Sequence, residues 1–272
     1  MSEKFELSRR KALGGLATIG LAGAGAGLGT SAYFSDEESF TNNELTAGEL
    51  DLIVDYWTSV DQGAATGDTG STTGSNTING NPAVAQYQIA DVKPGDSGFL
   101  VFCPKVVDNP SWLWVGSDGV TDYENGQTEP EMEVDDSGGD PGEGNGELSE
   151  AIQVTVSYCE YVGDEGGDRT DPENYEGREL NNPDDYTLAD LGAELENGFP
   201  IDGDDSTEGV QPYPASDDVG DQAGPCLCVE WEVPTDVGNE IQTDSVEFDI
   251  EFVSQQSRHN DELDNPFAPA PE

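Results

Sequence analysis

Four cysteines, Cys103, Cys159, Cys226 and Cys228, are the residues whose type and spacing most restrict the chemistry of this chain. An even number of cysteines favours disulfides in an exported protein, and four cysteines allow three pairings. On an extended strand Cys226 and Cys228 would lie roughly 6.5–7 Å apart at Cα, near the limit that a disulfide spans. We therefore expect each of them to pair elsewhere. A four-thiolate metal site is the alternative, but the sequence lacks the paired C-x-x-C motifs of structural zinc sites.

The alternation of apolar and polar residues predicts the side of its strand on which each cysteine lies. In the stretches 152–159 and 226–233 the apolar residues occupy every second position. Cys159, Cys226 and Cys228 lie at the positions in between, on the same side as the polar residues. These three thiols are therefore expected on the outer face of a sheet and not in the core. The side of Cys103 stays open, because the stretch 99–103 is apolar on both faces. A bond from Cys159 to either later cysteine would close the segment 163–224 at its base, and in the loop-entropy model it would contribute roughly 4 kcal/mol.

Other chemistry-bearing residues give no pattern typical of an active site. His259 is the only histidine, in Ser257-Arg258-His259-Asn260, and it has no HExxH context. A lone histidine at a strand end is usually solvated. The sequence has no G-x-S-x-G, P-loop or dinucleotide-binding motif. We therefore expect no enzymatic activity, no catalytic residue and no cofactor.

One acidic segment has the alternating oxygen ligands with which a calcium loop begins. It is Asp202-Gly203-Asp204-Asp205-Ser206-Thr207-Glu208. A calcium loop also needs Gly at its sixth position and Glu at its twelfth, and this segment has neither. The sequence therefore predicts no specific metal site, and only weak calcium binding on ligand type alone.

The charge of the chain excludes several functions. It has 58 Asp and Glu against 9 Lys and Arg, for a formal net charge of −49. Nucleic-acid binding requires clustered basic residues, which are absent, and anionic lipid is disfavoured for the same reason. Such self-repulsion opposes a compact state unless concentrated salt screens it, which is typical of a halophilic protein. Acidic runs such as Asp135-Asp136 are then expected to be solvated surface.

The first 32 residues are expected to be an export signal. Arg9 and Arg10 precede eighteen uncharged residues, Ala12 to Gly29, whose high content of Gly and Ala makes a poor permanent anchor. This pattern is typical of a twin-arginine or related secretory signal. Signal peptidase would cleave between Ala32 and Tyr33, although a retained anchor is the alternative. The rest is expected outside the cell, with no stable membrane span after cleavage.

Strand patterns dominate the chain after residue 32 and predict an all-β antiparallel sandwich. We expect a single domain over residues 33–259 and a disordered tail over 260–272. The expected strands are Glu49–Trp57, Val84–Ala90, Phe99–Cys103, Trp112–Val115, Ile152–Val162, Cys226–Val233 and Thr243–Val253.

Three segments interrupt the strand pattern. The segment Gln62–Asn81 is rich in Gly, Thr, Ser and Asn and is expected to be a long flexible loop. The segment Glu124–Glu147 is acidic, lacks apolar periodicity and is expected to stay solvated. The segment Gly163–Gly224 is expected to be an acidic insertion, mostly loop. Leucines at helical spacing, followed by Gly198, predict one short helix in it over Thr187–Asn197.

Several stretches, in their order along the chain, resemble the TasA/camelysin family of proteins exported with SipW-type signal peptides. Those near the N-terminus are Ser31-Ala32-Tyr33-Phe34-Ser35-Asp36, Leu45-Thr46-Ala47-Gly48-Glu49-Leu50-Asp51-Leu52 and Val92-Lys93-Pro94-Gly95-Asp96. The last strand, Ser245 to Gln255, resembles the family's C-terminal strand. Further stretches are similar to a haloarchaeal branch, namely Glu124-Asn125-Gly126, Thr128-Glu129-Pro130-Glu131, residues 231–240 and Arg258-His259-Asn260. The middle of the chain is unlike the bacterial members.

The resemblance implies a jelly-roll at the cell surface or in the extracellular matrix, where TasA-like members polymerise into biofilm filaments by donor-strand exchange. On this chain the donor would be Tyr33 to about Asn43, in which Tyr33, Phe34 and Phe40 are apolar side chains that a neighbouring subunit could cover. Packing of this segment on its own domain is the alternative. The expected partners are copies of this chain or related surface subunits.

Two other functions stay open from the sequence. Camelysin-like members have been assigned metalloprotease activity, but this chain has no zinc triad that would support it. The third reading is a cell-surface binding module whose insertion, residues 163–224, contacts a ligand.

Overall fold

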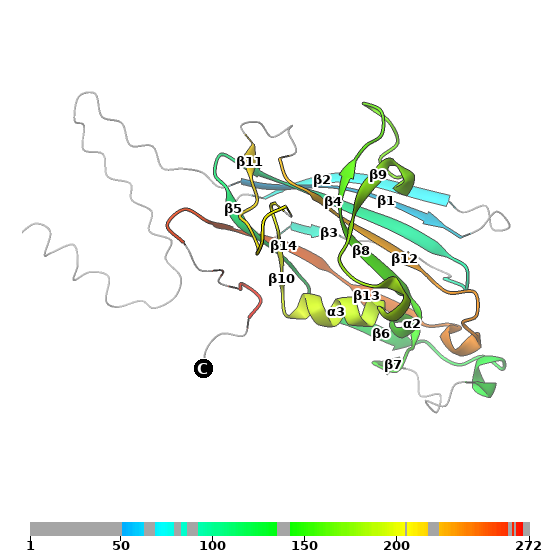
Figure 1. Cartoon of the computed structure of the whole chain (residues 1–272). Coiled ribbons are helices and arrows are strands. Elements are labelled where there is room, and N and C mark those ends of the chain that lie inside the picture. Colours follow the sequence, from blue (N-terminus) through cyan, green and yellow to red (C-terminus); the bar gives the residue numbers. More distant parts are fainter. Residues whose placement is uncertain are drawn as a thin grey trace, which may run out of the picture. The chain divides into compact units, whose positions relative to one another are not determined.

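The computed structural model describes residues 51–62, 69–78, 83–85, 92–134, 142–204, 206–216, 223–260, 263 and 265–268. These residues form a mainly antiparallel β-sandwich with two short α-helices (Figure 1), so the predicted all-β fold class is confirmed. The strands are β1 (Asp51–Asp61), β2 (Thr69–Ile78), β3 (Ala83–Ala85), β4 (Ser97–Val107), β5 (Ser111–Gly116), β6 (Val120–Glu124), β7 (Gly142–Glu143), β8 (Gln153–Tyr161), β9 (Tyr175–Glu179), β10 (Phe199–Ile201), β11 (Ala215–Ser216), β12 (Cys226–Glu232), β13 (Ser245–Phe248) and β14 (Ile250–Gln256). The helices are α2 (Leu148–Ala151) and α3 (Leu188–Glu196), and four 3₁₀ turns are η1 (Glu131–Glu133), η2 (Pro172–Asn174), η3 (Pro183–Asp185) and η4 (Asn239–Ile241).

The larger sheet has the strand order β2-β1-β4-β12-β8-β9, and β11 pairs in parallel with the end of β4. Alternation assigns its faces. Along β4, Leu100 and Phe102 enter the main core, whereas Phe99, Val101 and Cys103 lie on the opposite face. Both faces of β4 are buried. A strand that is apolar on both faces therefore lies in the middle of the sheet with cover on both sides.

The second layer is a four-stranded sheet of order β10-β5-β14-β3, which β6 and β13 continue into a three-stranded sheet of order β13-β6-β7. The main core lies between the layers. Its fully buried side chains include Phe102, Val106 and Val154 from the larger sheet and Leu113, Val115 and Phe252 from the second layer. Burial of such side chains provides most of the stabilisation of a sandwich.

The predicted single strand Thr243–Val253 is two strands, which is a correction to the sequence analysis. β13 pairs with β6, with Phe248 opposite Val120, whereas β14 pairs with β5, with Glu251 opposite Gly116. The two ladders differ in register by one residue, and Asp249 lies at the break. The alternation of apolar residues continues through this break, and for this reason the sequence did not reveal it.

Two of the predicted loops contain more structure than expected. Within Gln62–Asn81, β2 pairs with β1 along its whole length, from Leu52 opposite Ile78 to Asp61 opposite Thr69. Thr is common in this stretch and favours strands, so the Gly content was misleading. Within Glu124–Glu147, η1 and β7 form, and Glu124 and Glu131 are buried. The prediction of a wholly solvated segment was therefore wrong.

The predicted short helix is confirmed as α3. Thr187 and Asp190 form a reciprocal capping box at its start, and Leu188, Leu191 and Leu195 are buried. Most of the described residues in the rest of the insertion 163–224 are loop, as predicted, but β9, β10 and β11 pair with β8, β5 and β4. The insertion is thus built into both sheets.

The end of the chain also differs from the expected disorder where the structure describes it. Asn265 donates its side-chain amide to the carbonyl oxygen of Asn197 at 2.6 Å. The Phe267 ring packs on Gly116 and Gly198, where a Cβ atom would collide with it. Among the described residues no helix has the length and apolar character of a membrane span.

Candidate functional site

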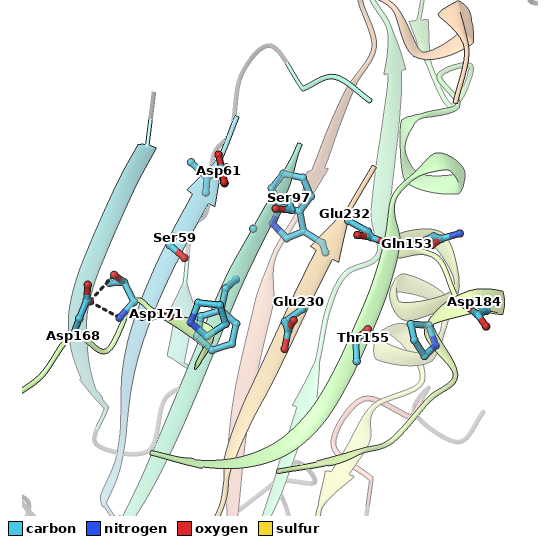
Figure 2. Close-up of a pocket in the computed structure, with 17 residues that line it drawn as sticks. Ser59, Asp61, Ser97, Gln153, Thr155, Asp168, Asp171, Asp184, Glu230 and Glu232 are labelled. Carbon is cyan, nitrogen blue, oxygen red and sulfur yellow. Dashed lines mark hydrogen bonds between the residues drawn. The ribbon is translucent and has the colours of Figure 1, made fainter. Parts of the chain in front are cut away.

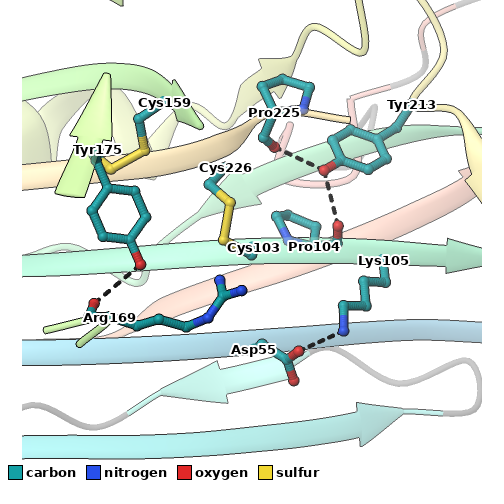
Figure 3. The surroundings of a disulfide bond; sticks show 11 residues. Asp55, Cys103, Pro104, Lys105, Cys159, Arg169, Tyr175, Tyr213, Pro225 and Cys226 are labelled. Atoms are coloured by element: carbon teal, nitrogen blue, oxygen red, sulfur yellow. Dashed lines mark hydrogen bonds and ion pairs between the residues drawn. A yellow bond between two sulfur atoms is a disulfide. The ribbon is translucent and has the colours of Figure 1, made fainter. Parts of the chain in front are cut away.

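Two disulfides join the three central strands of the larger sheet (Figure 3). Cys103 on β4 bonds to Cys226 on β12, with 4.2 Å between the Cα atoms, and Cys159 on β8 bonds to Cys228 on β12, with 6.0 Å. The expectation that Cys226 and Cys228 pair elsewhere is confirmed. Because the two cysteines of β12 bond in opposite directions, β12 is covalently tied to both of its neighbours.

All four cysteines are buried, each at most 4% exposed, so the expectation that Cys159, Cys226 and Cys228 lie outside a core was wrong. The side predicted for these three is right, since they face away from the main core, and Cys103, whose side was left open, lies on the same face. There they form a second, smaller core with Phe99 and Val101, and Trp57 and Tyr175 pack against it. The sequence did not predict this burial because the covering residues come from distant segments.

The cover of this smaller core is held by Arg169 from the insertion. Its guanidinium lies 4.8 Å from the centre of the Trp57 ring and 4.3 Å from that of Tyr161. The Tyr175 hydroxyl donates to the Arg169 carbonyl oxygen at 3.0 Å, and burial raises the pKa of Tyr175 to about 12. Cation–π contacts of this kind are stronger when partly desolvated. Arg169 thus fixes the start of the insertion over the disulfides.

Tyr213 fixes the other end of the insertion. It is fully buried, and its hydroxyl lies 2.9 Å from the carbonyl oxygen of Pro104 and 2.7 Å from that of Pro225 (Figure 3). Pro104 follows Cys103 and Pro225 precedes Cys226, so the contact lies directly beside a disulfide. A Cβ atom on Gly224 would collide with the Tyr213 ring, which explains a glycine there.

A groove of about 770 Å³ runs along the outer face of the larger sheet, between the sheet and the insertion. In Figure 2, Asp168 and Asp171 of the insertion lie at one wall, Asp184 lies at the other, and Glu230 and Glu232 of β12 lie between them. Its lining residues include these five carboxylates and Asp61, and none of the described lining residues is Lys or Arg. Burial, then Glu179 and Glu232, raises the pKa of Glu230. The groove therefore favours a cationic ligand.

The edge of β14 is the second candidate site, because a partly paired strand can accept another strand. β14 pairs with β5 over Glu251–Gln256, and on its other side the described residues Ala83–Ala85 of β3 pair with Ile250–Phe252. Ser257 N donates to Pro110 O at 3.4 Å in continuation of the β5 ladder. Since directions alternate along an antiparallel ladder, Ser254 and Gln256 direct their N–H and C=O groups away from β5. No described strand pairs with them there.

The remaining predicted residues divide into two groups. Arg9, Arg10, Ala32, Tyr33, Phe34 and Phe40 lie outside the described residues. His259 is exposed, in a turn with φ of 63°, and the cluster of possible metal ligands among the described residues does not include it. In the calcium-like segment the Asp204 carboxylate accepts hydrogen bonds from Ser206 and Thr207, which lower its pKa, so this segment is a self-bonded turn.

Sequence reasoning missed the groove and the edge of β14. The groove is formed by residues from six stretches of the chain, and only the unusual presence of Arg169 and Arg178 in an otherwise acidic insertion hinted that the insertion folds back. The edge of β14 depends on which strands pair with it, which sequence does not give. No family model matches the chain, and no curated protein matches it.

Proposed function

We propose that the chain is a secreted structural protein of the cell surface or extracellular matrix, a filament subunit that assembles by donor-strand exchange. The edge of β14 from Val253 to Gln256, which no strand among the described residues pairs, is the observation that carries this proposal. A strand added there would satisfy the outward backbone groups of Ser254 and Gln256 and would extend the four-stranded sheet. The two disulfides and the acidic surface are in keeping with a protein that works outside the cell in brine.

The donor in this proposal is the segment from Tyr33 to about Asn43 of a neighbouring subunit. It has the composition that strand addition needs, with aromatic residues at Tyr33, Phe34 and Phe40 that gain by burial. The resemblance to TasA-like proteins supports the same assignment. A free N-terminus at Tyr33 is a condition of the proposal.

Substitution Ser254→Pro is expected to abolish filaments and leave the subunit folded. Proline removes the N–H group that Ser254 directs to the open edge, and it leaves the ladder with β5 intact. Ser254→Ala keeps that N–H group and should assemble as the wild type does. Negative-stain microscopy in concentrated salt, on proteins that begin at Tyr33, compares the three, and circular dichroism checks that each is folded.

A second substitution controls for damage to the sheet. Gln255→Pro removes an N–H group directed to β5 and should lower the unfolding temperature, which Ser254→Pro should not. Filaments of Ser254→Pro that equal those of the wild type would refute β14 as the acceptor. Wild-type protein that forms no filaments under any salt condition would refute the assembly itself.

The groove favours a second candidate function, a cell-surface module that binds a cationic peptide. Its walls come from the insertion, and its carboxylates converge on one hollow. Tetralysine, tested by calorimetry at the lowest salt that keeps the protein folded, should bind several-fold more weakly to a Glu230→Gln/Glu232→Gln variant. Glu165→Gln/Glu173→Gln, at exposed positions outside the groove, is the matched control. Equal affinity of both variants would refute a site in the groove.

A further inference from the structure

Three carboxylates converge where β6 ends, at a site remote in sequence from the calcium-like segment. Glu124 is the last residue of β6, Glu147 precedes α2, and Asp244 precedes β13. One oxygen from each lies within 4.8 Å of the others. Glu124 is only 2% exposed, and the other two are half-buried. The cluster thus lies partly below the protein surface, with Glu124 at its buried end.

The pairing of the strands places two of these carboxylates face to face. β13 pairs with β6 so that Ser245 lies opposite Tyr123, and the same register one step further places Asp244 opposite Glu124. Like charges directly opposite each other in a sheet are destabilising. Because Glu124 is buried and faces a second carboxylate, the pair requires a nearby positive charge to compensate the repulsion.

Unsatisfied oxygens point to where that positive charge would lie. Glu124 uses Oε1 to accept a hydrogen bond from Gly126 N at 2.8 Å, but its Oε2 is buried with no hydrogen-bond partner. Asp244 uses Oδ2 to accept from Glu147 N at 2.7 Å, and its Oδ1 is likewise buried without a partner. A buried carboxylate oxygen without a donor is costly. Glu124 and Asp244 thus each have one carboxylate oxygen that accepts a hydrogen bond and one buried oxygen that accepts none.

The electrostatic surroundings of Asp244 are acidic. Burial, followed by the charges of Glu124, Glu131 and Asp122, raises the pKa of Asp244 to about 6, against the lowering effect of the hydrogen bond from Glu147 N. The charged groups that act on Asp244 are all carboxylates. Glu131 is itself fully buried on η1, where its Oε2 accepts from Thr128 N at 3.0 Å. No side chain in this set supplies the positive charge.

We infer that a divalent cation, Ca²⁺, binds between Glu124, Glu147 and Asp244 and ties β6 to β13 and to the start of α2. The donor set is all oxygen, which suits a hard cation and not zinc. Two oxygens on opposite sides of a Ca²⁺ ion, each at about 2.4 Å, lie about 4.8 Å apart, so the three oxygens fit around one ion. Mg²⁺ requires a smaller octahedral shell and keeps its water, so it fits less well.

The backbone around the site is shaped to bring the three segments together. A Cβ atom on Gly146 would lie 2.9 Å from the backbone of Tyr123 and 3.1 Å from Asp244 Cγ, so only glycine allows this approach. The Asn125 amide donates to Thr243 O and Ser245 Oγ, both at 2.9 Å. These contacts hold the carboxylates at short range before any ion binds.

The test is a comparison of the full chain with Glu124→Gln and Asp244→Asn in concentrated KCl, with CaCl₂ or MgCl₂ added after treatment with EGTA. Saturating Ca²⁺ should raise the unfolding temperature of the wild type by about 5–10 °C, and Mg²⁺ should raise it much less. Each variant should lose at least about tenfold in Ca²⁺ affinity by calorimetry. In EGTA, Glu124→Gln should unfold at or above the temperature of the wild type, because it removes repulsion.

Asp204→Asn is the matched control, since it removes one carboxylate from the exposed calcium-like segment and should leave the high-affinity site unchanged. If Glu124→Gln has only lost a ligand, it should unfold at or above the wild-type temperature in EGTA and below it in Ca²⁺. If the variant is misfolded, it should unfold at a lower temperature than the wild type under both conditions. Equal Ca²⁺ affinity in the wild type and Glu124→Gln would overturn the site. An equal response to Mg²⁺ would overturn its assignment to Ca²⁺.

Discussion

Removal of both disulfides is expected to unfold the protein under conditions in which the oxidised form is fully native. The bonds close segments of 123 and 69 residues. In the loop-entropy model each constrains the unfolded chain by about 4–5 kcal/mol, which is a large part of the stability of a domain. The four half-cystines also fill the smaller core, so their substitution adds the cost of lost packing.

The expected result can be divided between the two bonds. Paired substitution of Cys159 and Cys228 by Ala, or of Cys103 and Cys226, should each lower the free energy of unfolding by about 4 kcal/mol or more, measured by urea denaturation in concentrated salt. The second pair should cost more, because its loop is longer and Tyr213 is anchored beside it. Reduced protein whose denaturation midpoint equals that of oxidised protein would contradict this account of the larger sheet.

Loss of salt is expected to have an effect of similar size. The chain carries a net charge of −49, and Lys105 forms an ion pair with Asp55 at 2.7 Å. In molar salt the Debye length is about 3 Å, so this repulsion is screened, whereas in dilute buffer it acts across the whole domain. The fold should therefore be lost when the salt concentration falls below about 1 M.

Circular dichroism during stepwise dialysis from concentrated KCl measures this loss. Replacement of exposed carboxylates such as Glu165, Glu173 and Glu176 by Gln should move the midpoint to lower salt, because each change removes repulsion without touching the core. Sucrose at matched osmotic strength should not substitute for KCl, since it does not screen charge. An unchanged spectrum in dilute buffer would contradict the halophilic interpretation.

Sequence alone predicted the elements whose pattern is local. β5, β8, β12 and α3 follow directly from alternation or from leucine spacing. The even number of cysteines predicted disulfides, and the spacing of Cys226 and Cys228 predicted that each pairs elsewhere, but the sequence did not decide the pairing. β2 was missed because its stability comes from pairing with β1 and not from an apolar face of its own. The break at Asp249 was missed because apolar and acidic residues alternate without interruption from β13 into β14.

The candidate sites could not be predicted because they depend on distant pairings. Among so many acidic residues, nothing local marks Glu124 and Asp244, and only the register of β13 on β6 brings them together. The burial of the cysteines likewise depends on the contacts of Arg169 with Trp57 and Tyr161, which hold the insertion against the sheet. In both cases tertiary packing decides whether the residue is exposed on the surface or becomes part of a buried site.

The proposed assembly is tested most directly by locating the partner of the N-terminal segment in filaments. A photo-crosslinking residue at Phe34, in filaments mixed from ¹⁴N and ¹⁵N protein, should yield crosslinked peptides of mixed isotope that contain Val253 to Gln256. Crosslinks of mixed isotope show that the donor and the acceptor belong to different molecules. If every crosslink from Phe34 joins peptides of the same isotope, or if none reaches β14, donor-strand exchange at this edge is contradicted.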